Sequence, residues 1–370
     1  MTNMFDYLTW RGDLTFSQVR PNPVDALIFS TLAYVFYGDK AKAEPGQAMT
    51  LGECAAEFFT LENPENRVRV KKDMELLRAA AATTRFGQTR LCMYENRFLP
   101  EQETQFAAMT FLLDDGTMFV VYRGTDNSLV GWKEDFNMSF KAHIASQLDA
   151  AKYLSNIAKK YRQKVRTGGH SKGGNLAVYA AAFADKAAKN KIINVYNNDG
   201  PGFIEEITDT KEYKEAIEKV HTYIPQSSVV GRLLNHEEKY TIVQSVQKGI
   251  MQHDLYSWQL EGKKLISLAE VTNGSQFVDK TLKEWLKGID PKQREIVIDA
   301  IFEIINTTDA NSFKEIREKL FTDVRLMLKK YQSLDDESKK MIMEFFQTLI
   351  RTAKNTAIEE IPTFGRNNKE

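Results

Sequence analysis

The chain has 370 residues, 42% hydrophobic and 27% charged, which is ordinary globular usage, so disorder of the whole chain is excluded. Fifty basic residues balance fifty acidic ones, and this neutral total gives no support for binding to nucleic acid or an anionic membrane surface. Two cysteines are too few for a disulfide framework, and no run approaches the roughly 18 apolar residues of a transmembrane segment. The first residues also lack the pattern of a secretory signal, so we expect a cytoplasmic protein.

Helices and loops are expected over the first hundred residues. Asn22 and the proline after it precede an apolar run, and proline is favoured in the first turn of a helix. Thr50 and Glu53 have the spacing of a capping box, in which each side chain bonds the other residue's backbone N–H. A third helix is expected over residues 67–82.

Strands alternate with helices in the middle of the chain. Residues 105–113 and 118–122 are rich in strand-forming residues, and the Asp-Asp-Gly-Thr between them is typical of a hairpin turn. Helices are expected over residues 145–161 and 175–188, and further strands over residues 164–167, 192–196, 219–224 and 240–246. This alternation predicts an α/β fold with a mainly parallel sheet flanked by helices and a mixed edge at the hairpin.

The last hundred residues are expected to be helical. An Asp-Pro pair opens a helix at residue 290, and these apolar positions fall on one of its faces: Ile296, Val297, Ala300, Ile301, Ile304 and Ile305. Further helices are expected over residues 312–330 and 337–354. The chain is therefore divided into a helical segment (1–85), an α/β core (86–264) and a C-terminal helical region (265–370).

The sharpest local motif is Gly169-His170-Ser171-Lys172-Gly173, a G-x-S-x-G sequence. In this motif a serine lies on a tight turn from strand to helix, and small residues on either side let the two elements approach. The motif alone is weak, but here a strand is expected before it and a small-residue helix after it. Ser171 is therefore the candidate nucleophile, and the alternative is a glycine-rich turn without a chemical role.

A nucleophilic serine needs a base, and the chain offers five histidines. The triad order in such folds is serine, acid, histidine, which places His143 and His170 poorly. We expect His170 to pack beside the turn, His221 to be a structural residue of a strand, and His236 to lie in a solvated charged loop. His253 follows the last expected strand of the core, where a loop can carry it back over the serine, so it is the preferred base.

Several carboxylates compete for the position of the acid. Asp199 follows the strand after the serine and has the correct place in the chain, although its Asp-Gly-Pro-Gly sequence also suits an ordinary turn. Asp254 adjoins His253, and neighbouring side chains rarely face each other in a loop. Glu237 and Glu238 are more distant alternatives.

An acyl-transfer site also needs hydrogen-bond donors for the oxyanion. One is expected from the backbone N–H of Lys172, directly after the serine, and the second from an earlier loop at the same edge of the sheet. Gly124 and Thr125 follow an expected strand, and Thr125 can offer its N–H with its hydroxyl as support. The sequence shows no metal-binding or nucleotide-binding motif, so no metal and no organic cofactor are expected.

These motifs resemble the α/β-hydrolases, and among them the class 3 lipases, through a bacterial branch of largely uncharacterised hydrolase-like proteins. The resemblance covers residues 90–260 and rests on Tyr122-Arg123-Gly124-Thr125, Trp132, Asp135, the glycine-rich turn at residues 169–174, and His253. It implies that Thr125 belongs to the oxyanion hole, with Ser171 as nucleophile and His253 as base.

The sequence departs from that family at two positions. The lipases carry their acid near position 228, where this chain has Ser228. Either Asp199 has taken over the role, or the neutral Ser228 orients His253. The lysine after the nucleophile also replaces the small or apolar residue common in lipases, which predicts a more polar site.

The sequence thus predicts a serine hydrolase of the carboxylesterase or lipase type that cleaves an acyl ester or thioester. Ser171 attacks the carbonyl, His253 moves the proton, and Asp199 holds the imidazole. Donors at residues 125 and 172 bind the oxyanion. The supporting residues are Trp132, Asp135, His170 and Ser228. The expected partner is a small acyl ester or a lipid.

The alternative is a catalytically weak or inactive protein on a hydrolase scaffold. The missing aspartate near position 228 and the long helical extension suggest it. The C-terminal helices would then bind a regulatory partner or a second copy of the chain. A third interpretation is that these helices cap the active site and select substrates.

Overall fold

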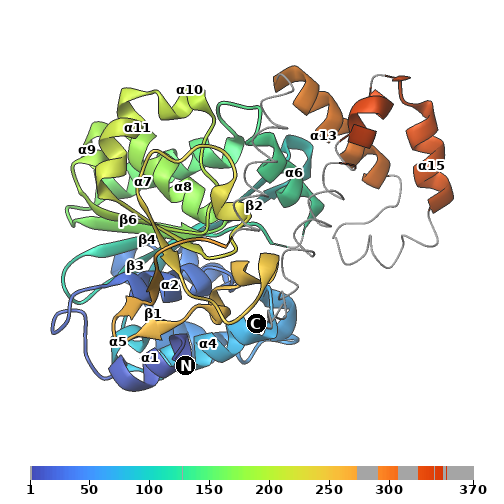
Figure 1. Ribbon diagram of the computed structural model, residues 1–370. Helices are drawn as coiled ribbons and strands as arrows, with labels where there is room; N and C mark the ends of the chain where they lie inside the picture. Colours follow the sequence, from blue (N-terminus) through green and yellow to red (C-terminus); the bar gives the residue numbers. More distant parts are fainter. Residues whose placement is uncertain are drawn as a thin grey trace, which may run out of the picture.

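A mixed β-sheet forms the centre of the molecule (Figure 1). The computed structural model describes residues 2–126, 128–272, 291–306, 324–336, 338–344 and 347. Within this part of the chain nine strands form the sheet, side by side in chain order: β1 (Met49–Thr50), β2 (Arg90–Leu99), β3 (Thr104–Leu112), β4 (Met118–Tyr122), β5 (Val165–His170), β6 (Ile192–Asn198), β7 (Val220–Pro225), β8 (Tyr240–Val243) and β11 (Ser267–Leu268). Strands β4 to β8 run parallel, and the outer pairs are antiparallel. A separate small hairpin pairs β9 (Leu260–Glu261) with β10 (Lys264–Leu265).

The parallel strands and the β3–β4 hairpin confirm the expected α/β pattern. The sheet is mixed rather than mainly parallel, because four of the eight strand pairs among the described residues are antiparallel and these lie at both edges. The expectation of helices and loops over the whole first hundred residues is wrong for β2, which pairs with β3 along most of its length. The register shifts between Cys92 and Glu95, and Met93 has a positive φ of 55°. This bulge interrupts the alternation of buried and exposed residues by which a strand is recognised in a sequence.

The N-terminal helices cover one face of the sheet (Figure 1). They are α1 (Met4–Arg11), α2 (Pro23–Leu32), α3 (Leu51–Phe58), α4 (Lys71–Ala81) and α5 (Thr84–Gly87). Thr50 caps α3 with the expected capping box, and Asn22 caps α2 with a second capping box that was not predicted. Helix α2 contacts β4, β5 and β6, and a fully buried Asp25–Arg85 ion pair of 2.6 Å joins it to α5.

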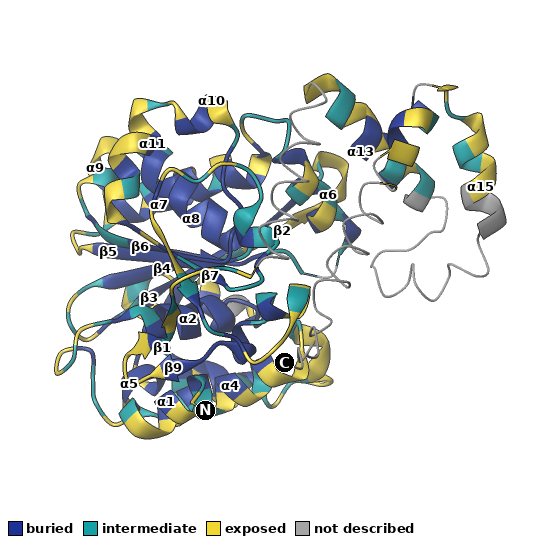
Figure 2. Ribbon diagram, in the orientation of Figure 1, coloured by how far each residue is buried: buried dark blue, intermediate teal, exposed yellow. Residues whose placement is uncertain are grey.

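A second helical layer covers the opposite face (Figure 2). It contains α6 (Leu129–Asn137), α7 (Ala145–Lys160), α8 (Lys172–Phe183), α9 (Lys186–Lys189), α10 (Glu205–Thr208) and α11 (Lys211–Ala216). Helix α8 is buried along nearly all of its length between β5, β6 and α7, which explains its small side chains. It begins at Lys172, three residues before the expected start, because the serine turn leads directly into it.

The described part of the C-terminal region contains α13 (Pro291–Asn306) and α15 (Val324–Ser333). Helix α13 begins at the proline, as expected, and packs against α6 (Figure 1). Residues 312–323 of the next expected helix lie outside the described residues, and of the last one only residues 338–344 and 347 are described, as helix. None of the helices in the described ranges has both the length and the apolar character needed to cross a membrane.

Candidate active site

Ser171 stands on the turn between β5 and α8, with φ 57° and ψ −132°. Positive φ is strained for a residue with a side chain and persists only where the surroundings enforce it. A Cβ on Gly169 would overlap the backbone of Gly173, and a Cβ on Gly173 would overlap the carbonyl oxygen of Tyr122. The glycines therefore let strand and helix meet closely enough to hold Ser171 in this conformation, the geometry that the motif predicts.

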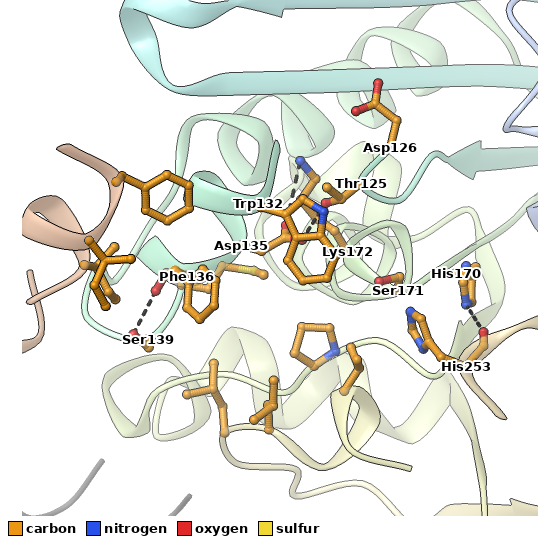
Figure 3. A pocket seen from close by; sticks show the side chains of 18 of the residues that line it. Thr125, Asp126, Trp132, Asp135, Phe136, Ser139, His170, Ser171, Lys172 and His253 are labelled. Atoms are coloured by element: carbon orange, nitrogen blue, oxygen red, sulfur yellow. Dashed lines mark hydrogen bonds and ion pairs between the residues drawn. The ribbon is translucent and has the colours of Figure 1, made fainter. Parts of the chain in front are cut away.

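His253 lies beside Ser171 (Figure 3) and forms a hydrogen-bonded pair with Asp199. Asp199 follows β6, and His253 is the last residue of the short helical turn Gly249–His253. Oδ2 of Asp199 lies 2.7 Å from Nδ1 of His253. Ser171 is joined to the same region because its N–H donates to the carbonyl of Asn198 at 3.0 Å. With Nδ1 held by the carboxylate, Nε2 is the imidazole nitrogen left for the serine hydroxyl.

Ser228 supports the carboxylate of Asp199. Its hydroxyl donates to Asp199 Oδ1 at 2.5 Å, and the backbone N–H of Gly231 donates to the same oxygen at 3.1 Å. Asp199 is fully buried and accepts three hydrogen bonds in all, counting the one from His253. Of the two explanations that the sequence left open, the geometry fits Asp199 as the partner of His253, with Ser228 behind it.

The competing residues lie elsewhere. The side chain of His236 is buried and pairs with Glu238 at 2.9 Å, so the expectation that it is solvated is wrong. Glu238 also accepts hydrogen bonds from the hydroxyls of Tyr213 on α11 and Thr222 on β7. Asp254 accepts from the N–H of Tyr256 in its own turn. His221 lies on β7 and bonds Asn194, as a structural residue would.

His170 packs beside the turn, as expected, and holds the loop of His253. Its Nε2 lies 2.8 Å from the carbonyl oxygen of His253, and its Nδ1 lies 2.8 Å from the hydroxyl of Tyr34. A carbonyl can only accept, so Nε2 carries the proton and Nδ1 accepts from Tyr34. Burial holds the pKa of His170 well below its usual value, and the nearby His253 and Arg69 lower it further, so this histidine is neutral.

Thr125 lies after β4 on the other side of Ser171, and its hydroxyl donates to Oδ2 of Asp135 at 2.6 Å. Burial raises the pKa of Asp135 to about 6, against the opposing effects of Lys172 and of this hydrogen bond. Asp135 Oδ1 has no hydrogen-bond partner among the described residues. Within the same residues neither the N–H of Thr125 nor that of Lys172 donates to a protein acceptor, so both are available to a ligand.

The side chain of Lys172 is fully buried, and its ammonium donates to Glu134 Oε2 at 2.8 Å and to the carbonyl of Gln105 at 2.9 Å. Glu134 also accepts the N–H groups of Gln105 and Ser146. The expectation that this lysine makes the site more polar is therefore wrong, because its charge is neutralised inside the protein. Instead it ties the start of α8 to β3 and α6.

A cavity of about 370 Å³ opens beside Ser171 (Figure 3). Thr125, Trp132, Asp135 and His170 line it, together with apolar residues of α6, α13 and the segment 230–234. Tyr34, Glu134 and the α13 side chains are parts of this site that the sequence reasoning missed. The apolar stripe of α13 was visible in the sequence, and a cap over the active site was one of the interpretations it left open, but the sequence did not show which side chains would line the cavity. No cluster of three or more metal-ligating side chains occurs among the residues that the structure describes.

The fold and the site define an α/β protein in which a serine on a strand-to-helix turn lies beside a histidine–aspartate pair. A family model described as Mbeg1-like matches residues 80–303, more than half of the chain. The chain therefore belongs to the Mbeg1-like family, which is lipase-like. None of the curated proteins compared with the chain matches it.

Proposed function

We propose that the protein is a serine hydrolase of the α/β-hydrolase type that cleaves an acyl ester or thioester through an acyl-enzyme on Ser171. One observation carries this proposal. Ser171 is held at positive φ beside His253, whose Nδ1 lies 2.7 Å from the buried carboxylate of Asp199. This arrangement matches the requirements of an activated alcohol: an adjacent base, and a third group that orients the base.

In the proposed reaction the Oγ of Ser171 attacks the carbonyl carbon as Nε2 of His253 takes the hydroxyl proton. Asp199 accepts the Nδ1–H bond and stabilises the imidazolium that forms. The tetrahedral intermediate collapses, and His253 returns the proton to the leaving alcohol or thiol. Water then attacks the acyl-enzyme with His253 as base, which releases the acid and restores Ser171.

The N–H groups of Thr125 and Lys172 are the proposed donors to the oxyanion. Polar side-chain contacts hold both residues in place. The hydroxyl of Thr125 donates to Asp135, and the ammonium of Lys172, at the start of α8, donates to Glu134 and to a carbonyl of β3. Donors fixed before the reaction need no reorganisation when charge develops on the carbonyl oxygen. One such donor contributes about 10²- to 10³-fold to the rate.

The test is hydrolysis of p-nitrophenyl butyrate by the parent protein and by Ser171→Ala. We expect a burst of p-nitrophenol close to one equivalent of protein, and a loss of about 10⁴- to 10⁶-fold in kcat for the variant. Ser139→Ala is the matched control, because Ser139 lines the same cavity and its hydroxyl donates to the local carbonyl of Phe136. Undiminished hydrolysis by Ser171→Ala would overturn the proposal.

The alternative of a non-catalytic module that binds through its C-terminal helices is not put forward as a second function. Val297 and Ala300 of the apolar stripe are buried in a cluster with Met341 and Ile342, and Ile301 and Ile304 pack against that cluster, so a large part of the stripe is already covered within the chain.

A further inference from the structure

The cavity beside Ser171 has a polar end and an apolar end. At the polar end, Thr125, Lys172, His170 and His253 lie around Ser171 in Figure 3, whereas the polar Ser139 lies beside Phe136. The other polar lining residues are Tyr34, Arg69, Asp126 and Asp135. The remaining lining is apolar: Trp132, Phe136, Met138, Pro201, Val230, Leu233, Leu234, Val297, Ile298, Ile301 and Phe302. In the same view Phe136 lies beyond Trp132 from the serine, so the apolar part leads away from the reacting centre.

Helix α13 supplies four of these apolar side chains, although it lies after the last strand of the sheet in the chain. Its contact with α6 is apolar and close. Ile298 and Phe302 pack against Leu129, and the rings of Phe302 and Phe136 meet edge to face with centroids 6.1 Å apart. The apolar side chains of α13 and those of α6 therefore form one continuous lining of the cavity.

Polar contacts fix the position of this wall. Arg294 of α13 donates to the carbonyl of Ser139 at 2.6 Å, and Asp299 lies 3.1 Å from the ammonium of Lys133. Val297, which also lines the cavity, and Ala300 pack on the helical residues around Met341. The side chains that face the cavity are thus held between α6 and the rest of the C-terminal region.

We propose that α13 determines which acyl chains the enzyme accepts, and that the acyl chain of the substrate lies in the apolar cavity between α6 and α13. This inference rests on the proposed function. A chain with polar substituents is disfavoured there, because burial in this part of the cavity would leave those groups without hydrogen-bond partners. The substrate class is therefore an ester or thioester of an unsubstituted hydrocarbon acid, with Ile301 and Phe302 limiting its length.

The test compares kcat/KM for p-nitrophenyl acetate, butyrate, octanoate and laurate. Ile301→Trp adds volume to the wall, and we expect the ratio of octanoate to acetate to fall roughly tenfold or more. Phe302→Ala removes volume and should shift the preference toward laurate. The matched control is Ile296→Trp, because Ile296 lies on the same helix, is 44% exposed and is outside the cavity lining. It should leave all four values unchanged.

Two results would overturn the inference: ratios that stay the same in Ile301→Trp and Phe302→Ala, or losses that are equal for acetate and octanoate. Both are read in protein whose Ser171 still reacts with a small phosphonate, so unfolding is excluded. Failure of the proposed function looks different, because the parent itself would then hydrolyse none of the four esters and its serine would stay unlabelled.

Discussion

Two aspartates lie near Ser171, Asp199 fully buried and Asp135 partly buried, and they differ in how many hydrogen bonds their carboxylates accept. Asp199 lies behind His253 and accepts three hydrogen bonds, from the imidazole, from a serine hydroxyl and from a backbone N–H. Asp135 lies behind Thr125 and accepts that hydroxyl on Oδ2, while its Oδ1 has no hydrogen-bond partner in the described part of the chain. Its nearest compensation is the ammonium of Lys172, 3.9 Å from Oδ1.

The difference indicates that hydrogen bonds stabilise one side of the site and charge interactions stabilise the other. On the side of the proposed base, the loops after β6 and β7 supply the hydrogen bonds that set the direction of the imidazole. On the side of the proposed oxyanion hole, the buried Lys172–Glu134 pair and the partly buried carboxylate of Asp135 hold the structure. Because burial raises the pKa of Asp135 to about 6, the oxyanion side is the one whose stability responds to pH near neutrality.

The largest effect is expected on the base side. Asp199→Asn replaces the acceptor of the Nδ1–H bond by an amide that favours the wrong tautomer, and kcat should fall about 10⁴-fold. Asp135→Asn keeps a hydrogen-bond acceptor for the hydroxyl of Thr125. Its kcat should fall far less, roughly tenfold, because one strong hydrogen bond is weakened. Ester hydrolysis by both variants measures the contrast, and equal losses would contradict the division of roles.

The second prediction concerns the buried charge pair. Lys172→Met leaves Glu134 buried without its partner, so the free energy of unfolding should fall by about 3–5 kcal/mol. Urea denaturation measures this, and the double variant Lys172→Met/Glu134→Gln should recover part of the loss. Lys159→Met is the control, because its pair with Asp185 is solvent-exposed and is worth at most about 1 kcal/mol. If the free energy of unfolding fell equally in Lys172→Met and Lys159→Met, burial of the Lys172–Glu134 pair would have no effect on stability.

The third prediction is a pH dependence of stability that belongs to Asp135. Its pKa is about 6 in the folded protein against 3.8 for an ordinary aspartate, so its contribution to stability is full below about pH 4 and is lost as the pH rises through 6. Between pH 4 and 7 the free energy of unfolding of the parent should fall by roughly 2–3 kcal/mol relative to Asp135→Asn. A difference between the two proteins that stays constant over this range would contradict the assignment.

The smallest effect is expected from the support of Asp199. Ser228→Ala removes one donor from a buried carboxylate, which corresponds to about 1.5–3 kcal/mol and at least a tenfold loss in kcat. Ser227→Ala is the matched control, because the neighbouring hydroxyl bonds Thr272 instead. If both variants kept full activity, the hydrogen bond from Ser228 would have no part in holding the base.

The sequence was sufficient to predict the parts of the site that depend on local pattern. Ser171 is marked by its glycines, and Asp199 and His253 by their places after β6 and β8, so the topology of the sheet brings them to one edge. Two other parts of the site join segments that are distant in the sequence: the ion pair of Lys172 with Glu134, and the hydrogen bonds that link Tyr34 to His170 and His170 to His253. Such contacts produce no sequence pattern from which they could be predicted. Strand β2 was missed because of its bulge, and α13 shows an apolar face without showing its partner.

Labelling with a fluorophosphonate, followed by mass spectrometry of the modified peptide, tests the central claim most directly. The parent protein, Ser171→Ala and His253→Ala are compared at the same concentration. The account predicts a single phosphonylated residue, Ser171, in the parent, and loss of the label in both variants. A parent that stays unlabelled, or a label that persists in Ser171→Ala, would contradict it.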